Sequence, residues 1–137
     1  MAKTGTHPSR PRHLLLADDG SKGAARARAL ALAIAAAAGA RLTVVYVREP
    51  TESPDEALRK LAAVRRAAAA AGQRCDTVIE RPVGITSPGR RILTVARQQG
   101  VDLIVVGARR ARIMRRLLGS VSRHVVSHAL VSVCVVR

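Results

Sequence analysis

Two turns of this sequence carry the residues best suited to bind an anion. One turn, Asp18–Ser21, follows a short apolar segment, and the other runs from Gly107 through an arginine-rich stretch to Gly119-Ser120. The first N–H groups of a helix have no partner within it, and the helix dipole favours negative charge there. A strand that ends on glycine, followed by a glycine-serine helix start, is therefore suited to hold a phosphate. Glycine also occurs at such turns for steric reasons alone, so the pattern leaves the ligand open.

The positive charge is concentrated in the last third of the chain. The formal net charge is +15, and after Asp102 the sequence has arginines but no Asp or Glu. Five of these arginines lie inside the second turn, at positions 109, 110, 112, 115 and 116. This distribution favours an anionic partner such as a nucleotide phosphate, a nucleic acid or an acidic protein. An alanine- and arginine-rich genome would give the same surface without a function, and the composition does not separate the two.

Three further pairs of residues are of types that can bind a metal or catalyse a reaction. His124 and His128 have a spacing that can hold a metal, but no acid or cysteine lies nearby in sequence as a third ligand, so we expect no metal site. Asp18 and Asp19 are neighbouring carboxyl groups of the kind that can act as a general acid and base, but Asp18 is better placed to cap its turn. Ser21 and Ser120 have no base beside them in the sequence, and helix capping explains both. We therefore predict no catalytic residue.

Apolar runs and turn residues predict the elements that position these turns. Serine followed by proline, as in Ser53-Pro54, is typical of a helix start, and glycine is typical of a helix end. We expect helices from Ser21 to about Ala38, from Ser53 to Gly72, from Ser87 to about Gln99 and from Gly119 to His128. We expect strands over Leu14–Ala17, Arg41–Val47, Cys75–Glu80, Asp102–Val106 and Val131–Val136.

Alternating strands and helices predict a doubly wound α/β domain with a five-stranded parallel sheet and helices on both faces. We assign residues 13–137 to this one domain and residues 1–12 to a disordered tail. In such sheets a ligand lies beyond the carboxyl ends of the strands, where the direction of winding reverses. If the first and fourth strands are neighbours, both anion-binding turns line one crevice.

Composition narrows the protein class. The 137 residues include one aromatic side chain, Tyr46, so we expect alanine-rich helices packed closely on a Val/Ile/Leu sheet. Residues 1–13 lack the apolar centre of a secretory signal, and charged Arg26 and Arg28 exclude a membrane helix over residues 24–40. Cys75 and Cys134 form no CxxC pattern, and we interpret them as buried thiols of a cytoplasmic protein.

Three segments together resemble the universal stress protein family, over nearly the whole chain from His13 to Arg137. ADDGS resembles the family's V-D-x-S after the first strand, and VVYVREP resembles its second strand. VDLIVVGARR…LLGSVSRHVVSHALVSVCVVR resembles its closing block, in which G-x2-G-x9-G-[S/T] binds ATP. With this resemblance we expect the strand order 3-2-1-4-5.

The resemblance also implies which residues contact the nucleoside. Asp19 would hold the ribose, and Val47 would pack on adenine or accept from it through its backbone. Ala17, at the end of the first strand, belongs to the same site. Val106 and Gly107 would border the sugar and the α-phosphate.

On the phosphate side, the resemblance assigns Gly119, Ser120 and Val121 to the cradle at the helix start. The sequence departs from the family here, because Arg110 replaces the second glycine and eight residues instead of nine separate it from Gly119. One interpretation is a decayed site on a retained fold. Another is that the arginines replace backbone N–H groups as phosphate donors. A third is that they face solvent.

We therefore expect a cytoplasmic regulatory protein, not an enzyme, that binds ATP, AMP or another phosphorylated ligand. Any Mg²⁺ would be bound mainly by the phosphates. The sequence does not exclude slow ATP hydrolysis or autophosphorylation. The resemblance implies a homodimer through residues 131–136, an apolar strand that would otherwise be an exposed edge, with protein partners that the sequence does not name. One alternative is a nucleotide-free dimer of the same fold. The other is a basic nucleic-acid-associated protein, which the lack of stacking aromatics disfavours.

Overall fold

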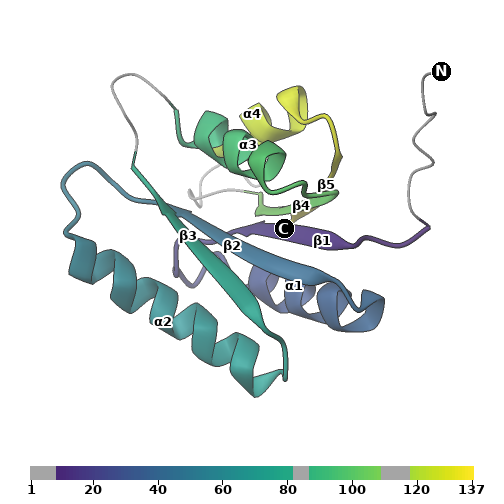
Figure 1. Ribbon diagram of the computed structural model, residues 1–137. Helices are drawn as coiled ribbons and strands as arrows, with labels where there is room; N and C mark the ends of the chain where they lie inside the picture. The colour runs from purple at the N-terminus through teal and green to yellow at the C-terminus, as the bar shows by residue number, and fades with distance from the viewer. Residues whose placement is uncertain (1–8, 82–86, 109–117) are drawn as a thin grey trace.

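Strands and helices alternate along the chain in the computed structural model, which describes residues 9–81, 87–108 and 118–137 (Figure 1). The strands are β1 (His13–Ala17), β2 (Arg41–Val47), β3 (Cys75–Glu80), β4 (Leu103–Gly107) and β5 (Ser132–Val136). The helices are α1 (Ala25–Ala38), α2 (Pro54–Ala70), α3 (Pro88–Gln98) and α4 (Ser120–His128). The five predicted strands and four predicted helices are all found, with bounds that differ by a few residues at some ends.

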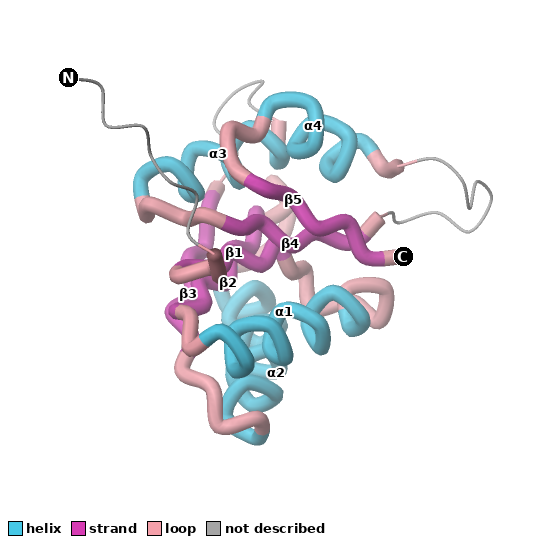
Figure 2. The backbone as a smooth tube through the Cα atoms, turned by 90° about the vertical axis from the view of Figure 1, so that its right-hand side faces the viewer, coloured by secondary structure: helices cyan, strands magenta, loops and turns pink. Residues whose placement is uncertain are grey.

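The strands form one parallel sheet in the order β3-β2-β1-β4-β5. Helices α1 and α2 cover one face of the sheet and α3 and α4 cover the other, as both views show (Figures 1 and 2). The predicted fold class and strand order are confirmed. Because β1 lies between β2 and β4, the direction of winding reverses beside it.

The core lies on both faces of the three inner strands. Leu14 and Leu16 pack with α1 and α2, whereas Leu15, between them, packs with α3 and α4. All three leucines are fully buried. A strand buried on both faces appears in sequence as a continuous apolar run, and this is why β1 could be predicted. Alanines of α1 pack against the sheet in place of larger side chains, as expected for this composition.

The start of α1 differs from the prediction. Ser21 was expected to cap the helix, but α1 begins at Ala25, and Ala24 at its N-cap makes no side-chain bond. The Ser21 hydroxyl instead accepts the N–H of Ala24 (3.2 Å) within a preceding turn. The start of α2 follows the prediction: Ser53 and Glu56 form a reciprocal capping box.

A close contact joins the two helices on the second face. A Cβ atom placed on Gly89 of α3 would lie 2.9 Å from the Cβ of His124 on α4. That distance is shorter than non-bonded carbon atoms tolerate, so only glycine allows the two helices to approach this closely.

The amino ends of β1 and β4 are held together by one carboxylate. Asp102 accepts the backbone N–H of Arg12 (2.9 Å) and of His13 (3.1 Å), and its own N–H donates to the carbonyl of His13 (3.0 Å). This one acid thus fixes the register of the two strands. Residues 1–8 of the predicted tail lie outside the described residues.

His13 is buried at the same end of the sheet. Its Nδ1 donates to the carbonyl oxygen of Gln99 (3.1 Å), since a carbonyl can only accept. Its Nε2 lies 2.8 Å from the hydroxyl of buried Thr43, which donates to it when the imidazole is neutral. Burial, together with the charge of Arg41, lowers the pKa of His13 below its ordinary value of 6.5.

We predict that acid destabilises the fold through His13. Because the folded-state pKa of His13 is lowered, its contribution is complete above pH 6.5 and is lost as the pH falls below that value. The free energy of unfolding should fall by up to about 1.4 kcal/mol per pH unit there. Urea denaturation between pH 8 and pH 5 measures this slope. His13→Gln should flatten it, and parallel curves for the variant and the unchanged protein would refute the assignment.

Candidate functional site

The first predicted anion-binding turn meets the described ends of the second at the carboxyl edge of the sheet. β1 and β4 pair directly, so the turn after β1 lies beside the end of β4. A Cβ atom placed on Gly107, the last residue of β4, would lie 3.9 Å from the carbonyl oxygen of Gly23. Beyond the second turn, the N–H of Gly119 donates to the carbonyl of Ala108 (2.7 Å) and holds the start of α4 against the end of β4. The structure thus brings together the β1–α1 turn, the end of β4 and the start of α4.

A buried ion pair holds the first turn. The Asp18 side chain is fully buried, and its two oxygens accept from Nε (2.6 Å) and Nη2 (3.0 Å) of Arg28 on α1. The same carboxylate accepts the N–H of Gly20 (2.8 Å), which is the capping role predicted for it. The hydrogen bonds that Arg28 donates to Asp18 raise the pKa of Arg28 above its ordinary value. Arg28 was missed by sequence analysis, because its partner lies ten residues away across a turn.

The turn itself has a fixed backbone. Asp19, the residue implied to hold the ribose, accepts the N–H of Ser21 (3.0 Å) through its carboxylate. Gly20 has a φ of +73°, and a Cβ atom there would lie 2.9 Å from the Cβ of Lys60 on α2. Any side chain at this position would be strained and would displace α2. The Asp19 carboxylate is therefore presented from a turn that has little freedom to move.

The start of α4 offers fewer N–H groups than the sequence suggests. The N–H of Gly119 is engaged by Ala108, and the hydroxyl of buried Ser122 lies 2.9 Å from the same carbonyl oxygen. Ser120 and Val121 hold the first two positions of the helix, where N–H groups have no partner within the helix. Two of the three predicted cradle residues thus retain donors of the expected kind.

Three apolar residues of the predicted site lie on one face of the sheet. Ala17, Val47 and Val106, near the carboxyl ends of β1, β2 and β4, pack with the core beneath α3 and α4. Val106 is itself buried, so a ligand can reach only its backbone. Arg110 and the other four arginines of the second turn lie outside the described residues.

A sequence model of the Universal stress protein family matches residues 11–137. The chain belongs to the universal stress protein family. The resemblance of the three sequence segments is thereby confirmed. No curated protein sequence matches the chain.

Solved structures of universal stress proteins have the same fold. The chain is 28% identical to UspA from Lactobacillus plantarum, with a TM-score of 0.78 over 94% of this chain and 99% of that one. It is also 28% identical to a universal stress protein in complex with cAMP, with a TM-score of 0.77 over 94% and 98%. A universal stress protein from Archaeoglobus fulgidus in complex with dAMP is 22% identical, with a TM-score of 0.75 over 92% and 98%, a likeness of fold alone.

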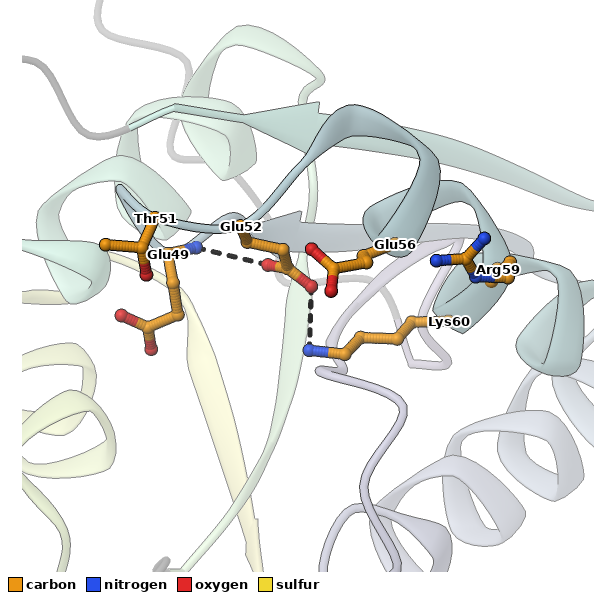
Figure 3. Close-up of a pocket in the computed structure, with 6 residues that line it drawn as sticks. All are labelled: Glu49, Thr51, Glu52, Glu56, Arg59 and Lys60. Atoms are coloured by element: carbon orange, nitrogen blue, oxygen red, sulfur yellow. Dashed lines mark hydrogen bonds and ion pairs between the residues drawn. The ribbon is translucent and has the colours of Figure 1, made fainter.

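This universal stress protein also has a charged hollow of about 420 Å³ outside the predicted site (Figure 3). It lies between the β2–α2 loop and the first turns of α2. It is lined by Glu49, Thr51, Glu52, Glu56, Arg59 and Lys60.

The buried acid of this hollow is already bound within the protein. Glu52 forms an ion pair with Lys60 (2.7 Å), and it accepts from the hydroxyl of Tyr46 and from the N–H of Glu49 (3.3 Å). Burial alone would raise the pKa of Glu52, but these interactions outweigh it and lower that pKa. The interaction with Glu52 also raises the pKa of Lys60. The network ties β2 to α2, next to the contact between Lys60 and Gly20, and we assign it a structural role.

The histidines and cysteines show no sign of metal chemistry in the part of the chain that the structure describes. His124 and His128 stack with ring centroids 4.2 Å apart, and Nδ1 of His128 donates to the carbonyl of His124 (2.9 Å). Within the described ranges, no three His, Cys, Asp or Glu residues gather around a common point. Cys75 and Cys134 are free and half-buried, more exposed than predicted, because β3 and β5 are the edges of the sheet.

Among the described residues, none of the helices is long and apolar enough to cross a membrane.

We predict that the two partners of the buried ion pair depend on each other. Asp18→Val and Arg28→Leu should each lower the free energy of unfolding by about 3 kcal/mol, since each leaves one buried charge uncompensated. The double variant Asp18→Val/Arg28→Leu should recover most of that loss. Urea denaturation measures all three variants.

The matched control is the exposed ion pair Arg41–Asp76, in which Arg41→Ala should cost about 0.5 kcal/mol or less. Additive losses in the double variant would show that Asp18 and Arg28 are not coupled.

Proposed function

We propose that this universal stress protein binds an adenine nucleotide in the crevice between β1 and β4. The observation that carries the proposal is the meeting of the Asp19 turn and the α4 start across Gly107. Support comes from the relative of 28% identity that is in complex with cAMP and covers nearly all of this chain. The proposal is a binding role, not an enzymatic one.

In this proposal the base lies over the apolar residues Ala17 and Val47, and the Asp19 carboxylate accepts from ribose hydroxyls. Val106 and Gly107 border the sugar through their backbone. A flat apolar base suits such a surface, because van der Waals contact with it needs no polar partner.

The phosphates are assigned to the N–H groups of Ser120 and Val121, at the positive end of the α4 dipole. Gly119 then acts as the residue that holds the helix start against Ala108. Arg110 stands where the family motif has its second glycine, and in this proposal its guanidinium binds phosphate oxygens bidentately. Mg²⁺ would enter bound to the phosphates.

We further propose that the protein reports its ligand to protein partners as a cytoplasmic homodimer joined at β5. Leu130, directly before this edge strand, is 90% exposed, and Val126 on α4 is 45% exposed. Val133 and Val135 are only partly buried against α3 and α4. A strand edge flanked by exposed apolar side chains is covered in most stable proteins. The two free cysteines fit a reducing compartment.

The nucleotide proposal is tested by a variant that removes one N–H group. Ser120→Pro should weaken AMP and ATP binding about tenfold, since proline suits the first helical position but has no N–H. Ser120→Ala keeps the N–H and should bind several-fold more tightly than Ser120→Pro. Isothermal titration measures both, and unchanged melting temperatures confirm that α4 is intact.

Two results would contradict this proposal. One is a protein that binds no adenine nucleotide and carries none after purification and heat release. If Arg110→Gly with one inserted residue then restores binding, the site has decayed and the nucleotide-free dimer is the correct alternative. The other is equal affinity for Ser120→Pro and the unchanged protein.

The dimer proposal is tested with a charge at the exposed edge. The unchanged protein should have twice its chain mass of 14.5 kDa in analytical ultracentrifugation, and Leu130→Glu should be a monomer. Leu58→Glu on α2 is the matched control, because this leucine is also exposed but lies on the opposite face of the sheet from α4. A monomeric unchanged protein, or a dimer that Leu130→Glu leaves intact, would refute the β5 interface.

A further inference from the structure

We infer that Glu80 selects a nucleobase with an exocyclic amino group, and that Arg91 positions its carboxylate. The inference rests on the proposed function and names the specificity of the same site. It concerns the base end of the crevice, where the apolar residues described above cannot distinguish one purine from another.

The sheet register places Glu80 beside the proposed base. Glu80 and Val47 are paired residues at the carboxyl ends of β3 and β2. Val47 packs beneath α3 and α4, and so does Val78, two residues before Glu80 on the same strand. Side chains alternate along a strand, so Val47 and Glu80 project from the same face and are neighbours there.

Glu80 is the polar residue among those at the carboxyl ends of the described strands on this face. The residues at or next to the carboxyl ends of the described strands on this face are Ala17, Val47, Glu80, Val106 and Val135. Apolar contacts are equal for bases of equal size and shape. A carboxylate among them can discriminate, because it accepts hydrogen bonds but cannot donate them.

Arg91, on the first turns of α3, holds this carboxylate. Its Nη2 donates to Oε2 of Glu80, and the two side chains are only 29% and 20% exposed. The Nε of Arg91 is fully buried and has no hydrogen-bond partner among the described residues. A ligand cannot reach this buried Nε. A base can instead donate its amino group to the Glu80 carboxylate, which stays 20% exposed and which Arg91 holds in position.

This chemistry favours adenine over hypoxanthine. Adenine carries an amino donor at the position where hypoxanthine carries a carbonyl oxygen. A carbonyl oxygen facing the Glu80 carboxylate would place two acceptors together and leave both unsatisfied. This costs more binding free energy than the loss of a single contact, so such a ligand binds more weakly. An ion pair that only anchored α3 to the sheet would affect stability and leave this choice unchanged.

The experiment compares the dissociation constants of AMP and IMP by isothermal titration of the full chain. We expect the unchanged protein to prefer AMP by about tenfold or more, the ratio that one hydrogen bond to a charged group supports. Glu80→Gln should bring the ratio close to one, because an amide can turn to offer either a donor or an acceptor. Arg91→Lys should lower the ratio less, since it keeps the charge but not the fixed geometry.

Asp76→Asn is the matched control. Asp76 lies on the same strand and the same face, in an ion pair with Arg41, but at the opposite end of the sheet. It should keep the AMP preference of the unchanged protein. If Glu80→Gln does not fold, Glu80→Asp, which withdraws the carboxylate from the base, should reduce the preference for AMP in its place.

The outcomes separate this inference from the proposed function. Binding of AMP and IMP with equal affinity by the unchanged protein, or a preference that survives in Glu80→Gln, overturns the role of Glu80 and leaves nucleotide binding standing. An unchanged protein that binds neither nucleotide overturns both.

Discussion

The position of β1 between β2 and β4 is the constraint on which the rest of the structure depends. Its three central leucines are fully buried, so the strand has no face or edge in contact with water. Polar groups are therefore confined to its two ends. At one end His13 needs Thr43 and Gln99 as partners, and at the other Asp18 needs Arg28. The same burial that stabilises the sheet thus determines where its polar side chains can gather.

The alanine-rich composition affects how the turn after β1 is supported. Tyr46, the one aromatic residue, is buried on the α1 and α2 face, and its hydroxyl is satisfied by Glu52 and Lys60. Lys60 in turn packs beneath Gly20. A helix that is two elements away along the chain therefore contacts the turn that carries Asp19. The rigidity of that turn comes from α2 as well as from its own hydrogen bonds.

Local patterns were enough to predict the elements and the fold class, and the family resemblance added the strand order. Neither predicted the side-chain pairs that complete the candidate site. The capping box of Ser53 and Glu56 acts within four residues, and sequence analysis found the helix start that it forms. The partnerships of Asp18 with Arg28 and of Glu80 with Arg91 join different elements, so no spacing indicates them. The start of α1 was placed too early because Ser21 caps a turn with the geometry of a helix start.

The contact between Gly89 and His124 has a consequence for the width of ligand that this fold can accept. Helix α3 carries Arg91, and α4 carries Ser120, so the two helices bear opposite ends of the proposed site. Their separation is set where Gly89 meets the histidine. A redesign that accepts a bulkier ligand would therefore begin at position 89, before any residue that contacts the ligand is changed.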